Sequence, residues 1–206
     1  MDRHLDAEQA LQRLRDGNAR FVQHVVSLDA LLSHARRAEQ AREQRPFAVV
    51  LGCSDSRAPA EFIFDQGLGD LFVIRVAGNI AAPSQVGSIE FAIERFGVEL
   101  VVVLGHSNCG AVRATLDHCF RPEATSAGLH AIVDRIRPAV QPLAAIAAHD
   151  DEALMAAAVR ANVCATLHAL RNASCLLEER IGAGQLRIVG ADYDLASGEV
   201  RFFEAT

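Results

Sequence analysis

Two short apolar runs constrain the fold of this chain more than any other feature of its sequence. Residues 47–51 (Phe-Ala-Val-Val-Leu) and 100–104 (Leu-Val-Val-Val-Leu) are rich in β-branched side chains, and each is followed at once by a glycine. Neither run alternates apolar with polar residues, and this is typical of strands buried on both faces of a parallel sheet. The sequence therefore predicts an α/β fold in which helices cover the sheet on both sides.

Side chains that can bind metal follow both runs directly. Cys53, Asp55 and Arg57 come after the first run, whereas His106 and Cys109 come after the second. In open parallel sheets, ligands bind beyond the carboxyl ends of the strands, which is where these residues fall. We therefore expect the two strand ends to form a single site.

The other elements are predicted from hydrophobic periodicity and from helix-breaking residues. The expected strands are 47–51, 70–76, 99–104, 186–193 and 199–203. The expected helices are 6–22 with an interruption at Gly17-Asn18, 29–44, 59–65, 85–96 with Ser84 as N-cap, one opening at Cys109, a broken helix over 129–148 containing Pro138 and Pro142, and a long helix from Asp151 to Ile181. This order predicts a mainly parallel sheet of four to five strands flanked by helices.

One domain is expected over residues 1–206, in which 1–45 form a helical arm and 46–206 form the α/β core. The second helical stretch of the arm has few apolar side chains after Leu32. Such an arm buries little surface by itself, so we expect it to lie on its own domain or on a partner subunit.

Charge and composition narrow the classes of partner. The formal net charge is −6 and the pI is near 5.7, so no basic field exists to gather nucleic acid or an anionic membrane. The acidic N-terminus lacks an apolar signal region, and we expect no membrane span and a cytoplasmic location. The five cysteines, an odd number, favour reduced thiols that are buried or bind metal.

Two thiolates and one imidazole are a suitable ligand set for Zn²⁺. Three protein ligands with an open fourth position are typical of a catalytic zinc, whereas structural zinc sites use four. The guanidinium of Arg57 would keep Asp55 ionised, so that Asp55 could accept a hydrogen bond from a zinc-bound water. Asp55 could instead occupy the fourth position itself, and the residues leave both arrangements open.

Cys53-Ser-Asp-Ser-Arg57 together with Gly105-His-Ser-Asn-Cys-Gly110 resembles the pair of signature motifs of the β-class carbonic anhydrases. The resemblance covers most of the chain, from residues 14–21 to residues 190–194. It implies one Zn²⁺ per chain, held by Cys53, His106 and Cys109, and an Asp55–Arg57 dyad that orients the nucleophile. The implied reaction is the reversible hydration of CO2 to bicarbonate by zinc-bound hydroxide.

The resemblance also implies substrate-binding positions and an assembly. The positions are Gln44, which would bond a substrate oxygen, Phe72 and Ala77, which would line the CO2 pocket, Phe91, where many members have Tyr, and Gly110. The implied assembly is a homodimer or a higher even-numbered homo-oligomer, with the arm of one subunit wrapped on its neighbour.

Two other functions compete with this interpretation. The same scaffold could hydrolyse CS2 or COS, which are linear analogues of CO2. The chain could also be a non-catalytic zinc-binding or thiol-sensing protein in which Asp55 is a permanent fourth ligand. Arg57 argues against this last possibility, because a structural site has no use for a guanidinium that competes for Asp55.

Overall fold

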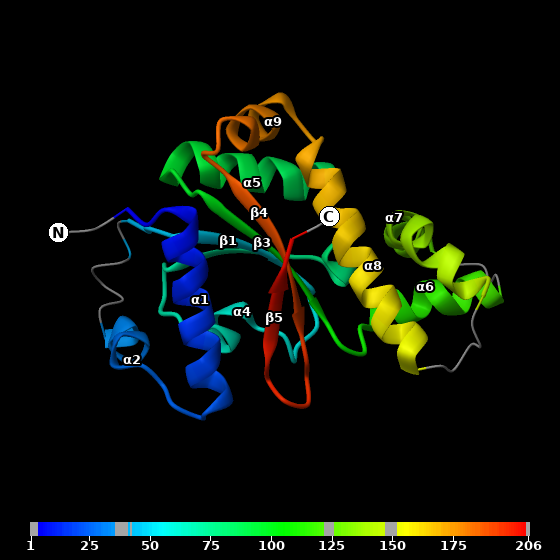
Figure 1. The fold of residues 1–206 in the computed structure, drawn as a ribbon, viewed down its shortest axis with the longest axis horizontal. Coiled ribbons are helices and arrows are strands. Elements are labelled where there is room, and N and C mark those ends of the chain that lie inside the picture. Colours follow the sequence, from blue (N-terminus) through cyan, green and yellow to red (C-terminus); the bar gives the residue numbers. More distant parts are fainter. Residues whose placement is uncertain (1–3, 36–40, 42, 122–125, 147–151, 205–206) are drawn as a thin grey trace.

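A five-stranded sheet with the strand order β2-β1-β3-β4-β5 forms the centre of the protein (Figure 1). The structure, a computed structural model, describes residues 4–35, 41, 43–121, 126–146 and 152–204. The strands are β1 (Ala48–Gly52), β2 (Leu71–Arg75), β3 (Leu100–His106), β4 (Arg187–Tyr193) and β5 (Val200–Phe203). Only β5 runs antiparallel to its neighbour, which confirms the predicted mainly parallel sheet.

Helices cover both faces of this sheet. On one face lie α1 (Ala7–Val22) and α4 (Ala60–Ile63), and on the other lie α5 (Pro83–Phe96), α8 (Glu152–Arg171) and α9 (Cys175–Gly182). Along β1, Val50 packs towards α1 and α4, whereas Val49 packs towards the opposite helices. Both faces of each central strand are therefore buried, which is why the strand sequences show no apolar and polar alternation.

A third apolar cluster closes the carboxyl end of the sheet. It contains the helices α6 (Gly110–Phe120) and α7 (Ala127–Ala144) and the first half of α8, which lie together beyond the strands in Figure 1. The short 3-10 helix η1 (Ala77–Asn79) follows β2, and Ile80 directly after it belongs to the same cluster. This cluster includes Cys53 and Cys109, so the side chains just after β1 and β3 are packed against it.

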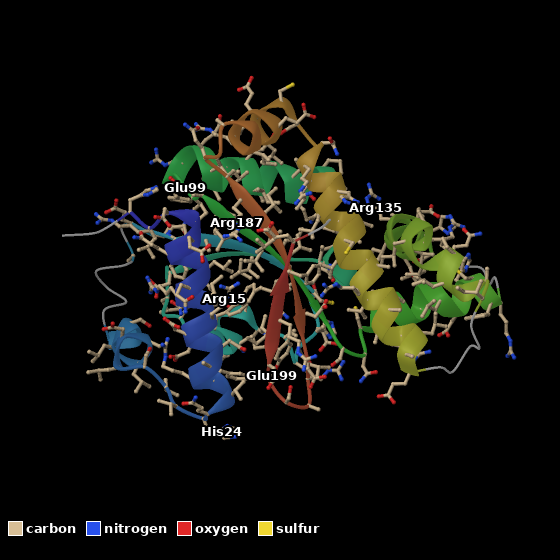
Figure 2. The ribbon with its side chains drawn as sticks, in the orientation of Figure 1. Arg15, His24, Glu99, Arg135, Arg187 and Glu199 are labelled. Atoms are coloured by element: carbon tan, nitrogen blue, oxygen red, sulfur yellow. The ribbon has the colours of Figure 1, made fainter. Side chains whose placement is uncertain are left out.

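The first helix packs on its own domain and is not interrupted. Leu11 and Leu14 are buried in the cluster that contains the sheet, and Arg187 of β4, labelled in Figure 2, bonds Glu8 at the start of α1. The predicted break at Gly17-Asn18 is wrong. Asn18 is buried and its amide donates to the carbonyl oxygens of Ile63 and Gly198, so it makes tertiary contacts from inside the helix.

The predicted break near the two prolines is also wrong, because α7 continues through Pro138 and Pro142. Both prolines lie on the exposed side of the helix, one turn apart. On this side the proline rings do not disturb the packed side of the helix, which lowers the usual cost of proline inside a helix. The buried side of α7 carries Val133, Ile136 and Val140, and their packing maintains the helix.

The predicted long helix over 151–181 is two helices. The amide of Asn172 donates to the carbonyl of His168 at the end of α8, and Ser174 caps α9 by accepting from the backbone N–H of Leu177. By length and hydropathy, α8 is the one helix within the described ranges that could span a membrane, and half of that stretch is buried inside the protein.

Other predicted boundaries shift by smaller amounts. The predicted helix 29–44 is observed as α2 (Leu28–Ala35), and residues 36–40 and 42 lie outside the described part. Helix α5 begins at Pro83, one residue before the predicted cap, because proline is well suited to the first helical position.

Candidate metal centre

Three ligand-bearing residues meet where β1 and β3 end. Cys53 follows β1 directly, His106 is the last residue of β3, and Cys109 is the N-cap of α6. Parallel pairing of Gly52 with Leu104 aligns the two strand ends. The three residues are 5%, 1% and 1% exposed, respectively, so the structure brings together in a buried site the set that the sequence predicted.

The spacing of the donor atoms fits a tetrahedral zinc ion. The two Sγ atoms are 3.9 Å apart, and the sulfur and imidazole ligand atoms all lie within 4.8 Å of one another. Two thiolates bound to one tetrahedral zinc at the usual Zn–S distance of ~2.3 Å would be separated by about 3.8 Å. The sulfur separation therefore already matches a metal-bound pair.

The histidine presents the correct nitrogen to such an ion. Nδ1 of His106 lies 2.9 Å from the carbonyl oxygen of Ser107, an acceptor that fixes the proton on Nδ1. Nε2 is then the unprotonated nitrogen, and it is buried without a hydrogen-bond partner. A buried polar atom with no partner is costly, and a metal ion would satisfy it.

The three ligands influence each other's ionisation. The hydrogen bond between the thiols lowers the pKa of Cys53 and raises the pKa of Cys109, so one proton of the pair leaves readily and the other is held. Burial lowers the pKa of His106, but the adjacent negative charge of Cys53 and the Ser107 carbonyl help to outweigh burial, so the pKa is raised. A divalent cation would compensate the negative charge that this cluster concentrates.

Asp55 and Arg57 form a tightly bonded pair beside the ligands. Nε and Nη2 of Arg57 donate to the two carboxylate oxygens at 2.9 and 2.7 Å, and the backbone N–H of Arg57 donates to Oδ1 at 2.9 Å. These bonds hold the pKa of Asp55 well below its usual range. Oδ2 lies 3.9 Å from Nε2 of His106, so an ionised carboxylate oxygen faces the candidate metal position.

Two further groups hold the first motif, and neither belongs to the predicted site. Arg75, at the end of β2, donates to the carbonyl oxygens of Cys53 at 3.0 Å and Asp55 at 2.6 Å. The backbone N–H of Gly78 donates to Sγ of Cys53 at 3.4 Å. Two features of the sequence could have indicated these groups: an arginine at the end of β2 and a glycine in the turn that follows. Neighbouring parallel strands end at the same edge of the sheet, so the end of β2 lies beside the end of β1.

The predicted substrate-binding residues fall into two groups. Ala77 lies in η1, next to Gly78, and Gly110 is the first residue of α6, next to Cys109, so both adjoin the ligand set. Phe72 and Phe91 pack together with a centroid separation of 6.1 Å. Phe72 pairs with Val49, four residues before Cys53, which places this aromatic pair towards the other end of the sheet.

Gln44 is not brought to the three ligands within one chain. It is exposed and precedes β1, whose opposite end carries Cys53. A five-residue strand is about 16 Å long, so the two ends of β1 form separate surfaces. Gln44 instead lines a hollow with residues 95–98, and its predicted contact with substrate stays a prediction.

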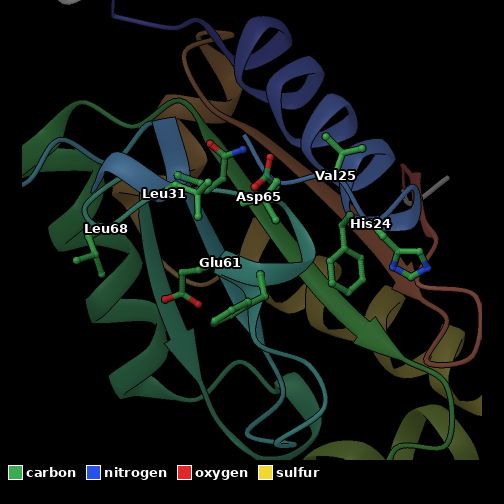
Figure 3. Close-up of a pocket in the computed structure, with 12 residues that line it drawn as sticks. His24, Val25, Leu31, Glu61, Asp65 and Leu68 are labelled. Atoms are coloured by element: carbon green, nitrogen blue, oxygen red, sulfur yellow. The ribbon is translucent and has the colours of Figure 1, made fainter. Parts of the chain in front are cut away.

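A large hollow lies away from the three candidate metal ligands. A cavity of about 670 Å³ opens between the end of α1, α2 and α4, and Figure 3 shows Val25, Leu31 and Leu68 around it. Its polar groups include His24, Glu61 and Asp65, and none of the three metal-ligand residues lines it. Its mostly apolar lining is suited to contact with another apolar surface.

Comparisons with known proteins agree with this geometry. The family model described as "Carbonic anhydrase" matches residues 48–200. A carbonic anhydrase of Mycolicibacterium smegmatis is 41% identical over 193 residues, which cover 93% of this chain and 90% of the relative. A protein named carbonic anhydrase 2 of Mycobacterium tuberculosis is 39% identical over 193 residues, covering 92% and 89% of the two chains, respectively.

A solved structure supports the same assignment. One of the two tetrameric β-carbonic anhydrases from Sordaria macrospora superposes with a TM-score of 0.72 and 25% sequence identity, over 84% of this chain and 88% of that chain. The family match contains both motifs and all but the last residues of the sheet. This chain belongs to the β-class carbonic anhydrase family.

Proposed function

We propose that this protein is a zinc-dependent carbonic anhydrase that interconverts CO2 and bicarbonate, with one Zn²⁺ per chain held by Cys53, His106 and Cys109. The observation that carries the proposal is the juxtaposition of a three-ligand set with a carboxylate held by arginine. A structural site would gain nothing from such a carboxylate. Zinc, when bound, would supply the Lewis acidity that makes water a nucleophile near neutral pH.

The side chains of the dyad would orient the attacking water. Oδ2 of Asp55 accepts one hydrogen bond from Arg57, and its remaining lone pair is available to a water beside His106. Because the pKa of Asp55 is lowered, this oxygen accepts a hydrogen bond and does not donate one. It would thereby turn a lone pair of the water oxygen towards the carbon of CO2. The new C–O bond yields bicarbonate, and the released proton passes to buffer.

Stopped-flow CO2 hydration on protein of measured zinc content, from pH 6.5 to 9, tests this function. We expect rapid turnover in the parent and a fall in kcat/KM of about 100-fold or more in Asp55→Asn, since an oriented proton acceptor contributes on this scale. Asp70→Asn is the matched control, because Asp70 also pairs with an arginine, Arg13 at 2.8 Å, but precedes β2 at the other edge of the sheet.

Three outcomes separate the possibilities. Full zinc occupancy without turnover at any pH would contradict the proposal, and the same protein would then be assayed with COS and CS2. Turnover that Asp55→Asn leaves unchanged would keep the reaction but exclude the orienting role of the dyad. Loss of activity in Asp70→Asn as well would point to general instability.

We further propose that the protein assembles as a homodimer or a larger even-numbered oligomer. The Sordaria macrospora relatives are described as tetrameric, and the face around the α2–α4 hollow exposes large apolar side chains, among them Phe62 at 72% exposure. Light scattering coupled to size-exclusion chromatography should give a mass that corresponds to an even number of subunits. In Phe62→Asp, the mass should shift towards that of the monomer. Ile146→Asp, at an exposed apolar residue just after α7, is the control. A monomeric parent would contradict this proposal.

A further inference from the structure

A buried amide in α8 makes contact with the strand-end turn that supports the metal ligands. Asn162 is 2% exposed, and it lies in a helix whose buried side is otherwise mostly aliphatic. Its Nδ2 donates to the carbonyl oxygen of Gly78 at 2.8 Å, across 84 positions of sequence. This hydrogen bond connects α8 to the η1 turn after β2.

Gly78 joins this amide to a metal ligand. Its N–H donates to Sγ of Cys53, while its carbonyl accepts from Asn162, so the peptide groups on both sides of Gly78 are held. The residue has φ 74°, and a Cβ there would lie 2.6 Å from Cδ1 of Ile136. This left-handed conformation favours glycine, which has no side chain to hold the turn in place. The turn is held by hydrogen bonds: those of Gly78 to Cys53 and Asn162, and the backbone bonds from Val76 to Gly52 and from Asn79 to Val76.

From this geometry we propose that Asn162 is a positioning residue for the zinc ligand Cys53. It fixes the η1 turn, the turn aims an N–H at the sulfur, and the N–H···S bond sets the direction and the electron donation of the thiolate. Groups that hold a ligand from outside the coordination sphere commonly affect metal affinity by 10- to 100-fold. The inference rests on the proposed zinc site, although it does not depend on which substrate that site takes.

The alternative is that Asn162 only satisfies a buried carbonyl and stabilises the fold. That role would change the free energy of unfolding without changing the metal–sulfur bond. Measurements on the metal centre itself therefore distinguish the two roles, and activity alone does not.

The experiment compares the unsubstituted chain with Asn162→Leu, which keeps the branching and the number of heavy side-chain atoms and removes the donor. Thr166→Val is the matched control, because Thr166 is a buried polar residue of the same helix, one turn further on. Zinc affinity is measured by competition with a chromophoric chelator. The near-ultraviolet thiolate-to-metal charge-transfer bands are recorded after substitution with Co²⁺. We expect 10- to 100-fold weaker zinc binding and displaced bands in Asn162→Leu, with parent-like values in Thr166→Val.

Asn162→Ser replaces Asn162→Leu if the latter does not fold, because a serine hydroxyl is too short to reach Gly78. Parent-like zinc affinity and Co²⁺ bands in a folded Asn162 variant would overturn the inference and leave the proposed function intact. A parent that binds zinc but does not hydrate CO2 would contradict the proposed function while the Asn162 comparison still applies. A parent that binds no zinc would overturn both.

Discussion

Gly17 provides a sharp test of how α1 sits on the sheet. In the interior of a helix, replacing glycine by alanine normally stabilises by about 1 kcal/mol, because alanine loses less backbone entropy. The structure predicts the opposite at this position. A Cβ at Gly17 would lie 1.8 Å from the carbonyl oxygen of Phe64 and 2.7 Å from its carbonyl carbon.

The size of the effect follows from these contacts. Real Cβ atoms essentially never approach another atom closer than 3.0 Å, so α1 and the Phe64 carbonyl would have to separate by about 1.2 Å. This shift would also stretch the two hydrogen bonds that the Asn18 amide donates to Ile63 and Gly198. Overpacking costs about 1–3 kcal/mol, and the loss of both hydrogen bonds costs about 1 kcal/mol for each bond. After the helix-propensity gain is subtracted, Gly17→Ala should lower the free energy of unfolding by about 2–4 kcal/mol.

Urea unfolding followed by circular dichroism, at one fixed protein concentration, measures this change. With a slope of about 3 kcal/mol per molar urea, the midpoint of Gly17→Ala should fall by about 1 M. Gly87→Ala is the control, because Gly87 lies in α5 and a Cβ at this position would have no atom within 4 Å, so its midpoint should rise slightly. If Gly17→Ala also raised the midpoint, α1 would not lie against α4 as the structure has it.

Three further predictions concern the metal centre. Removing zinc with a chelator should lower Tm, and added Zn²⁺ but not Mg²⁺ should restore it, since a soft thiolate set selects zinc. Arg75→Met removes the donors to the carbonyls of Cys53 and Asp55 and should weaken zinc binding about tenfold in a chelator competition; unchanged binding would exclude a supporting role. Because Arg57 lowers the pKa of Asp55, this carboxyl should show no ¹³C NMR titration between about pH 5 and 9. The pairing of Asp55 with Arg57 should stabilise the fold above about pH 4, and this stability should be lost as the pH falls through the pKa of Asp55 in the folded state. In Arg57→Met, the titration of Asp55 should move back up towards about pH 4.

The strand ends and their chemistry were predictable because they are encoded locally. A buried parallel strand needs a continuous β-branched run, and a glycine followed by cysteine or histidine marks where the run ends. The order of the elements then determines that β1 and β3 end on one edge. For this reason the grouping of Cys53, His106 and Cys109, and the pairing of Asp55 with Arg57, could be predicted from the sequence.

The errors occurred where tertiary contacts decide local structure. Gly17 and Asn18 have the character of a helix break, but in this fold the glycine permits close approach of a carbonyl and the asparagine bonds two distant segments. The prolines of α7 are tolerated because they face solvent. Asn162 has no sequence motif at all, since its partner is a backbone carbonyl 84 positions away.

The wide sequence separation of the metal ligands has a consequence for how the protein matures. Cys53 and Cys109 are 56 positions apart, and only the parallel pairing of β1 with β3 brings them together. Contacts of such long range form late in folding, so an emerging chain offers zinc no ready template. Unlike a zinc finger, which the ion itself folds, this protein would build its sheet first and load the metal afterwards. If the zinc site acts as proposed, protein made without zinc would be folded but inactive, and it should gain activity when the metal is added, without new protein synthesis.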